Sequence, residues 1–285
     1  MNGLGGLRRY IEADHAEPAM LAPLPPDDSP AERPAPQARD LIAGLEKGLA
    51  VICAFDQERP LLSVTEVAER CGLTRAAARR YLITLEHLGY MRSERGRWSL
   101  SAKVLRLAQS YMHSGRLPRV VQPELHRLVS ALKEASSSGV LDGDDVICIA
   151  ALTAGHLVSS TLQPGTRVPA YCTANGRVLL AALPPAQLDL WLASRRFEAR
   201  TPHTLTDPER LRAELARVRS QGYALVDQEL ELGLRTISVP LVSADGQVLA
   251  AINVSAHAAR RSAEQLIDEC LPALRQTQAT LRRQL

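Results

Sequence analysis

The chain has 285 residues, more than the roughly 100–200 of a typical domain, so its length predicts two compact units. With 46% hydrophobic and 23% charged residues, the composition is that of an ordinary globular protein and excludes a largely disordered or fibrous chain. No apolar run approaches the ~18 residues of a membrane span, and the N-terminus lacks the apolar region of a secretion signal. We therefore expect a cytoplasmic protein with no membrane partner.

The five cysteines lie far apart, without a Cys-x-x-Cys pair or a tight His/Cys group, which argues against a disulfide framework and a zinc site. Phosphate-loop, dinucleotide-binding, Gly-x-Ser-x-Gly and His-Glu-x-x-His motifs are also missing from the sequence. Cys172 with His156 or His203 as its base would make a nucleophilic pair, but the spacing gives this pair no support. We expect no metal, no cofactor and no enzymatic activity.

The net charge of +3 is distributed unevenly. Residues 1–38 carry three arginines against six acidic residues, whereas residues 39–115 carry twelve lysines and arginines against eight acidic residues. Between residues 74 and 97, six arginines stand against two glutamates. Such a local basic stripe suits a polyanionic partner, although a solvated helix face would have a similar composition.

The first elements are predicted from the spacing of apolar residues and from the proline, glycine and capping residues that start or end helices. Residues 1–38 are rich in proline and have no apolar period, which predicts a flexible tail. Apolar residues at helical spacing predict a first helix within residues 41–56. Ser63 and Glu66 form a capping box for a second, short helix, which Gly72 ends.

A third helix is predicted from Arg75 to about Leu88, with Thr74 as its cap and Gly89 as its end. Residues 90–100 then have the pattern of two short strands joined by a turn. Three short helices followed by a two-stranded ribbon describe a winged helix-turn-helix over residues 41–101. The third helix is expected to bury Ala78, Leu82, Leu85 and Leu88.

Burial of that stripe leaves the N-terminal end of the third helix exposed, and in this motif that end enters the major groove of DNA. Small alanines let the helix approach base edges, and an arginine pairs with a guanine edge or a phosphate, while wing arginines suit phosphate or minor-groove contact. The alternative is a small helical domain whose arginines only confer solubility. The candidate DNA-binding residues are Ser63, Thr65, Thr74, Arg75, Ala76, Ala77, Arg79, Arg80, Arg95 and Arg97.

A linker helix is expected over residues 102–116, with a hinge at residues 116–118 and a second domain over residues 117–285. That domain should begin with a helix near residues 122–134 and end with an amphipathic helix near residues 266–281. Between these helices the pattern predicts strands at 137–141, 146–151, 157–162, 223–227, 234–240 and 248–255, and helices at 173–183, 185–193 and 206–222, the last with a capping box at Thr206 and Glu209.

Polar residues fall on strand faces that should be internal. In the last predicted strand, alternation puts Asn253 and Ser255 opposite an apolar face, and in the strand before it Thr236 and Ser238 share a face. If these faces line a concavity, they supply the hydrogen-bonding groups that a small polar ligand needs; otherwise Asn253 and Ser255 meet solvent. The helix that begins near residues 173–175 would offer free backbone N–H groups to a carboxylate.

Four segments together resemble the IclR family of bacterial transcriptional regulators, in particular its branch that controls protocatechuate, 4-hydroxybenzoate and β-ketoadipate catabolism. The similarity runs from residue 40 to residue 285. The resemblance implies a winged helix-turn-helix, a linker helix used in dimerisation and a GAF-like α/β effector domain, so the whole chain is α+β. The segments are LEKGLAVICAF (45–55), LTRAAARRYLITLEHLGY (73–90), RVPAYCTANGRVLLA (167–181) and GYALVDQELELGLRTISVPL (222–241).

The same resemblance assigns an effector pocket to positions that include those found by alternation. After the strand at 146–151, many relatives of this branch carry an Arg-Ser pair where this chain has Ala151 and Leu152, so its ligand or binding geometry can differ. The candidate effector-binding residues are Thr173, Ala174, Asn175, Asp227, Thr236, Ser238, Asn253 and Ser255, with Asp227 and Glu229 expected to shape or close the pocket.

The sequence thus predicts a transcriptional regulator of aromatic-acid catabolism that binds a pseudo-palindromic operator in double-stranded DNA as a homodimer or homotetramer. Its effector would be a small organic acid of the protocatechuate, 4-hydroxybenzoate or β-ketoadipate type. Two alternatives belong to other classes: a small-molecule-converting enzyme with a regulatory DNA-binding domain, and an architectural DNA binder that has no ligand.

Overall fold

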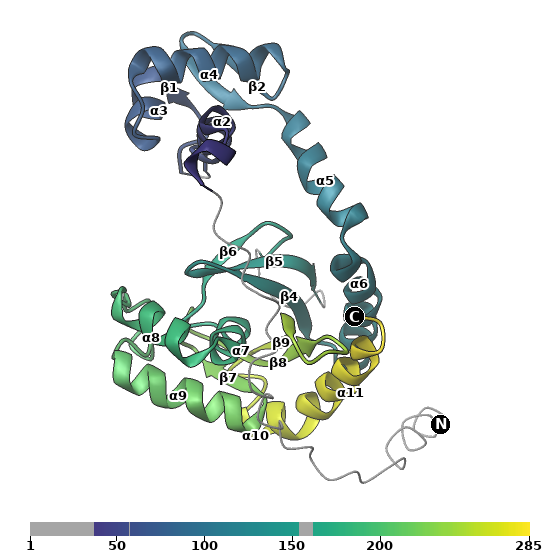
Figure 1. Cartoon of the computed structure of the whole chain (residues 1–285). Helices are drawn as coiled ribbons and strands as arrows, with labels where there is room; N and C mark the ends of the chain where they lie inside the picture. The colour runs from purple at the N-terminus through teal and green to yellow at the C-terminus, as the bar shows by residue number, and fades with distance from the viewer. Residues whose placement is uncertain (1–36, 57, 154–161) are drawn as a thin grey trace. The chain divides into compact units, whose positions relative to one another are not determined.

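A computed structural model describes residues 37–56, 58–153 and 162–285. The chain divides into two compact units, with the boundary along the chain between Gly115 and Arg116 (Figure 1). Each unit is described by itself. Nearly all of the segment predicted as a tail, and most of the strand predicted at residues 157–162, lie outside the described residues. Within the described ranges, no helix has the length and apolar character needed to span a membrane.

The first unit packs three helices against a small antiparallel sheet of order β1-β3-β2. The sequence predicted the helices and the β2–β3 hairpin but not β1, because a strand of two residues has no alternation to detect. The elements are a 3-10 turn (η1, Ala38–Asp40), α2 (Ala43–Cys53), β1 (Leu62–Ser63), α3 (Val64–Arg70), α4 (Arg75–His87), β2 (Met91–Glu94), β3 (Arg97–Leu100), a second 3-10 turn (η2, Ala102–Val104) and α5 (Leu105–Ser114).

The core of the first unit joins α4 to the hairpin, with Leu82 and Trp98 buried together. Leu88 was predicted to continue the buried stripe of α4, but it is 49% exposed. It is the residue that caps the helix, and Gly89, at a φ of +80°, turns the chain away. The helical period therefore stops before Leu88, and the prediction of its burial was wrong.

The second unit is built on a six-stranded antiparallel sheet of order β6-β5-β4-β9-β8-β7. The mixture of helices and strands in the two units confirms the predicted α+β class. The elements of this unit are α6 (Arg116–Leu132), β4 (Ala135–Asp142), β5 (Asp145–Leu152), β6 (Arg167–Pro169), α7 (Ala174–Ala182), α8 (Pro185–Ala193), α9 (Pro208–Gln221), β7 (Ala224–Asp227), β8 (Leu234–Val242), β9 (Val248–His257), α10 (Ala263–Gln265), a π-helical turn (η3, Leu266–Cys270) and α11 (Leu271–Arg282).

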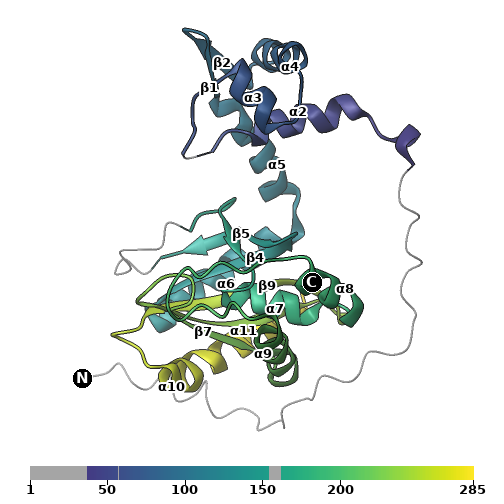
Figure 2. The same ribbon diagram turned by 90° about the vertical axis from the view of Figure 1, so that its left-hand side faces the viewer.

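Helices cover both faces of this sheet, and the two faces differ (Figures 1 and 2). Alternation along β9 sends Ala250, Ile252 and Val254 into an aliphatic core shared with α6 and α11. Ala251 points the other way, into a core shared with α7, α8 and α9. The face under α7 also carries the polar residues that alternation predicted. One face of the sheet is therefore aliphatic, and the other combines apolar packing with hydrogen-bonding groups.

Three boundaries in this unit differ from the predictions. Residues 116–118, predicted as a hinge, form the first turn of α6, where Pro118 is tolerated because the first helical N–H groups need no partner. The cap of α9 is Asp207 rather than Thr206, since the Asp207 side chain accepts from the Arg210 N–H at 2.8 Å. The short edge strand β6 was not predicted.

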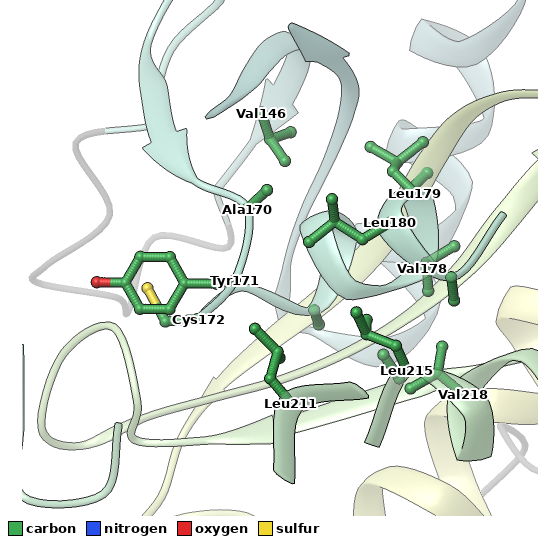
Figure 3. Close-up of a cluster of buried hydrophobic side chains, with 14 of the residues drawn as sticks. Val146, Ala170, Tyr171, Cys172, Val178, Leu179, Leu180, Leu211, Leu215 and Val218 are labelled. Atoms are coloured by element: carbon green, nitrogen blue, oxygen red, sulfur yellow. The ribbon is translucent and has the colours of Figure 1, made fainter. Parts of the chain in front are cut away.

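Helix α7 is embedded among apolar side chains, as Figure 3 shows, with Val178, Leu179 and Leu180 beside Leu211 and Leu215 of α9. Eight of its nine residues are buried. Because neighbouring side chains surround the helix, we expect the position of its N-terminal end to be fixed.

Candidate functional site

The outer face of α4 carries the residues predicted to meet DNA. The Thr74 hydroxyl caps this helix by accepting from the Ala77 N–H at 3.2 Å. Ala78, Leu82 and Leu85 are buried, whereas Arg75, Ala76, Arg79 and Arg80 are exposed and Ala77 is half-buried. The first two turns of α4 therefore present arginines and small side chains to the outside, which suits entry into a major groove.

Ser63 and Thr65 lie at the start of α3 and are half-buried. The predicted capping box is present, because the Ser63 N–H donates to the Glu66 carboxylate at 2.7 Å and the Glu66 N–H donates to the Ser63 hydroxyl at 3.3 Å. These hydrogen bonds with Ser63 lower the pKa of Glu66. The Ser63 hydroxyl is therefore already engaged as a cap, while Thr65 has no such role.

The two wing arginines are held differently. Arg95 is exposed at the turn between β2 and β3, at a φ of +50°. Arg97 donates to the Leu61 carbonyl at 3.4 Å and lies 3.9 Å from the Glu66 carboxylate. Arg97 is thus partly engaged by groups at the N-terminal end of α3. Arg95 is the more available of the two for contact with a phosphate.

A contact that the sequence did not predict ties the wing to α4. The Glu86 carboxylate accepts from the Ser93 N–H at 3.1 Å and from the Ser93 hydroxyl at 2.6 Å. Because α4 and β2 are joined in this way, the exposed arginines of the helix and the wing keep a fixed relation within this unit.

In the second unit, a cavity of about 150 Å³ lies between the sheet and the N-terminal end of α7. A cavity of that volume in another protein is known to hold a benzene molecule, so one six-membered ring fits. Its apolar walls include Val146, Cys148, Val168, Cys172, Val226, Leu230 and Leu234. Of the candidate effector-binding residues, six line it: Thr173, Ala174, Asn175, Thr236, Asn253 and Ser255.

The polar floor of the cavity consists of two cross-strand rows. One row contains Ser137, Asn253 and Ser238, which are direct neighbours on β4, β9 and β8, and Ala151 extends it onto β5. The next row places Ser255 beside Thr236. The Thr236 and Ser255 hydroxyls lie 3.2 Å apart and share a hydrogen bond. The register of three strands thus gathers these groups from distant parts of the sequence.

The roof of the cavity is the first turn of α7. The Thr173 hydroxyl caps it by accepting from the Gly176 N–H at 3.3 Å. The N–H groups of Ala174 and Asn175 make no hydrogen bond within the part of the chain that the structure describes. Both residues line the cavity, so two free donors at the positive end of a helix border it.

Two predicted effector residues do not line the cavity. Asp227 lies on the opposite face of the sheet from Val226, and its carboxylate accepts from Arg235 at 2.8 Å. This bond with Arg235 lowers the pKa of Asp227. The expectation that Asp227 shapes the pocket is not met, because alternation in β7 turns it away. Ser238 belongs to the first polar row but does not line the cavity, and its hydroxyl donates to the Asn175 amide oxygen at 2.7 Å.

Sequence reasoning missed Ser137 and Cys148 as lining residues, whereas Ala151 and Leu152, which also line the cavity, had been noted as the departure from relatives that can alter binding. The run of three serines in β4 was the one signal in the sequence that this strand could contribute hydrogen-bonding groups to a site. Cys172 also lines the cavity, and burial raises the pKa of its thiol to about 11, which keeps it protonated at neutral pH. A protonated, enclosed thiol is a poor nucleophile, so Cys172 packs rather than reacts.

Glu229, next to the cavity, is neutralised rather than free. Its carboxylate accepts from the buried Arg177 guanidinium at 2.6 Å and from the Leu205 N–H at 2.9 Å. Arg177 also donates to the Tyr171 carbonyl at 3.0 Å. This pair joins α7 to the β7–β8 loop, which carries the lining residues Leu230 and Glu231. Glu229 itself does not line the cavity, and the expectation that it shapes the pocket stays a prediction, in which Glu229 would act through this loop.

Comparison with known proteins places both units in one family. Residues 44–95 match the IclR helix-turn-helix domain, and residues 109–283 match the C-terminal domain of bacterial transcriptional regulators of the IclR type. Similar full-length proteins include the Pca regulon regulatory protein of Pseudomonas putida, 44% identical over 93% of this chain and 92% of that protein. The p-hydroxybenzoate hydroxylase transcriptional activator of Acinetobacter baylyi is 39% identical over 86% of this chain and 93% of that protein.

Among solved structures, a protein from Rhodococcus sp. RHA1 described as a transcriptional regulator is 40% identical, with a TM-score of 0.74 over 86% of this chain and 98% of that one. Sequence and structure agree over both units. The chain therefore belongs to the IclR family of bacterial transcriptional regulators.

Proposed function

We propose that this protein controls genes of aromatic-acid catabolism and that a small organic acid bound in the cavity under α7 switches its action. The relatives named for the pca regulon and for p-hydroxybenzoate hydroxylase support the pathway. The observation that carries the proposal is the cavity itself: it is ring-sized, and two free N–H groups border it beside a polar floor. Those N–H groups would receive the carboxylate of the acid.

The regulator would act in the cytoplasm as a homodimer or homotetramer, with two DNA-binding units reading the halves of a pseudo-palindromic operator. An effector that binds one arrangement of these units better than the other shifts the population between them. Burial raises the pKa of the Cys172 thiol, which disfavours the nucleophilic route of the enzyme alternative, and we expect the cavity to bind its acid without converting it.

Replacement of either Arg79 or Arg80 by alanine is expected to weaken operator binding by about 1–3 kcal/mol. A base-directed arginine lowers affinity mainly for the cognate sequence, whereas a phosphate-directed one lowers it for all sequences and reduces the salt dependence. Fluorescence anisotropy with operator and scrambled duplexes over a range of salt concentrations measures both effects. Arg283→Ala, at the exposed end of α11, is the control, and unchanged affinity in both α4 variants would refute the assignment of this helix.

At least one of 4-hydroxybenzoate, protocatechuate and β-ketoadipate is expected to raise the melting temperature of the full-length protein in proportion to the logarithm of its concentration. Chromatography of the same mixtures checks that the acid is recovered unchanged. Turnover would favour the enzyme alternative, and no shift with any acid would favour an architectural DNA binder.

A further inference from the structure

Resting on the proposed reading of DNA by α4, we propose that Lys103 fixes the start of the linker, formed by η2 and α5, on the C-terminal end of α4. Lys103 is then a positioning residue that determines which spacing of operator half-sites the protein accepts. It acts through the joint between the two helices and does not contact DNA. Three features support this proposal: the capping of the carbonyls that follow α4, the contacts of the Lys103 ammonium group, and its distance from the end of α4 that would enter the groove.

The chain returns to the end of α4 after it has formed the wing. Three consecutive carbonyls follow the last turn of this helix, those of Leu88, Gly89 and Tyr90. The Lys103 ammonium group donates to the first of them at 2.7 Å, and the Ser101 hydroxyl donates to the second at 2.5 Å. The Ser101 N–H donates to the third at 2.8 Å. Residues at the start of the linker therefore supply a donor to each carbonyl that follows α4.

The ammonium group of Lys103 has two contacts that its positive charge strengthens. Leu88 is the C-cap of α4, and the carbonyls at the C-terminal end of a helix carry a partial negative charge that attracts cations. The same ammonium group lies 5.2 Å from the centroid of the Tyr90 ring, within the range of a cation–π interaction. The aliphatic stem packs over Gly89, where an added Cβ would lie 3.5 Å from Cδ of Lys103. A neutral side chain of similar length would keep this packing and lose both attractions.

Lys103 lies far from the part of α4 that would read DNA. The helix has 13 residues, so its two ends are about 20 Å apart, and the candidate base contacts lie in its first two turns. Lys103 is bound at the other end. A rotation of about 10° about that end would move the first turn by about 3 Å, which is more than a hydrogen bond to a base edge tolerates. The contacts of Lys103 therefore bear on base reading through the orientation of α4 relative to the linker.

A stiff joint matters for an operator that has two half-sites. The linker leads from each DNA-binding unit to the rest of its chain, so the angle between α5 and α4 affects where the second α4 helix of an oligomer meets the DNA. With this angle fixed, binding of one unit raises the effective concentration of the other at one half-site spacing. With the joint loosened, the second unit samples more positions. Its effective concentration falls at the correct spacing, and a wrong spacing is penalised less.

Lys103→Met removes the ammonium group and keeps an unbranched stem. Fluorescence anisotropy of the full-length protein compares three duplexes: the operator, the operator with one half-site scrambled, and the operator widened between its half-sites. We expect the affinity of this variant for the operator to fall by about five- to tenfold, while its affinity for the half-scrambled duplex stays within about twofold. Its preference for the operator over the widened duplex should decrease. Unchanged affinity for the operator, or an equal loss for the operator and the half-scrambled duplex, would overturn the proposal.

A matched control and a conservative replacement test the role of the charge. Lys47→Met removes an exposed lysine from α2 of the same unit and should change the affinities for the operator and the half-scrambled duplex by the same factor. Lys103→Arg keeps a cation that can donate to the Leu88 carbonyl and lie over the Tyr90 ring, so it should keep the operator affinity within about twofold. If Lys103→Arg behaves like Lys103→Met, the positive charge is not the cause and the proposal is wrong.

The same assay separates the ways in which the proposal can fail. A direct phosphate contact of Lys103 would make Lys103→Met weaker with all three duplexes and lower the salt dependence by about one ion, which would refute the positioning role. If Arg79→Ala or Arg80→Ala weakens operator binding and Lys103→Met does not, the reading of DNA by α4 stands and the role of Lys103 falls. If none of the three variants changes operator affinity, both fall.

Discussion

Glu229→Ala is expected to destabilise the second unit by about 3–5 kcal/mol, because it breaks a buried ion pair. The substitution leaves the Arg177 guanidinium, which is 3% exposed, buried without its anionic partner. It also removes the acceptor of the Leu205 N–H. Urea unfolding followed by circular dichroism measures the loss.

Two further variants test whether the broken ion pair causes this loss of stability. Glu231→Ala, in the same loop but exposed, should change the free energy of unfolding by less than about 0.5 kcal/mol. Replacing both members of the buried pair, as in Arg177→Met with Glu229→Leu, should be less destabilising than Glu229→Ala alone, because no unpaired charge remains buried. If the single and double replacements cost the same, the ion pair is not the source of the effect.

Gly176→Ala is expected to destabilise the second unit by about 3 kcal/mol or more and to abolish effector binding. A Cβ atom at this position would lie 2.1 Å from the carbonyl oxygen and 2.3 Å from the Cα of Ala170. Both are backbone atoms, so the first turn of α7 must move away from Ala170, the residue that follows β6. The free N–H groups of Ala174 and Asn175 lie in that turn and would move with it.

The same substitution elsewhere provides the control. In α2, a Cβ at Gly48 would lie 3.9 Å from the nearest atom of Tyr81, an ordinary contact. Gly48→Ala should therefore be neutral or stabilise the first unit by up to about 1 kcal/mol, because alanine is the better helix former. Denaturant unfolding and calorimetric titration with 4-hydroxybenzoate check both variants, and a Gly176→Ala protein that binds normally would contradict the role given to α7.

Local patterns in the sequence predicted most of the elements, because helix periods, caps and turns depend on neighbouring residues. Helix α8 occupies the predicted residues, and Ser63 and Thr74 form the predicted caps. The errors also have local causes. Leu88 follows the helical period in the sequence but lies past the end of α4, and β1 is too short to show any pattern.

The cavity could be predicted only in part. Alternation placed Asn253, Ser255 and Thr236 on the correct face, since the period of a strand is local. The partner of Asn253 could not be found in this way, because Ser137 is 116 residues away and reaches it through the register of β4 and β9. Asp227 was predicted to shape the pocket, and the resemblance included it as well, but alternation in β7 turns it to the opposite face.

By itself, the sequence determined the class of the fold, the helix whose arginines face outward and the family. The first two depend on periodicity and local charge, which are properties of consecutive residues, and the family was indicated by the resemblance of four segments. Only the tertiary structure decided that the polar rows meet beneath α7 and that Glu229 is neutralised by Arg177. Strand register and long-range pairing bring these groups together, and neither follows from the order of neighbouring residues.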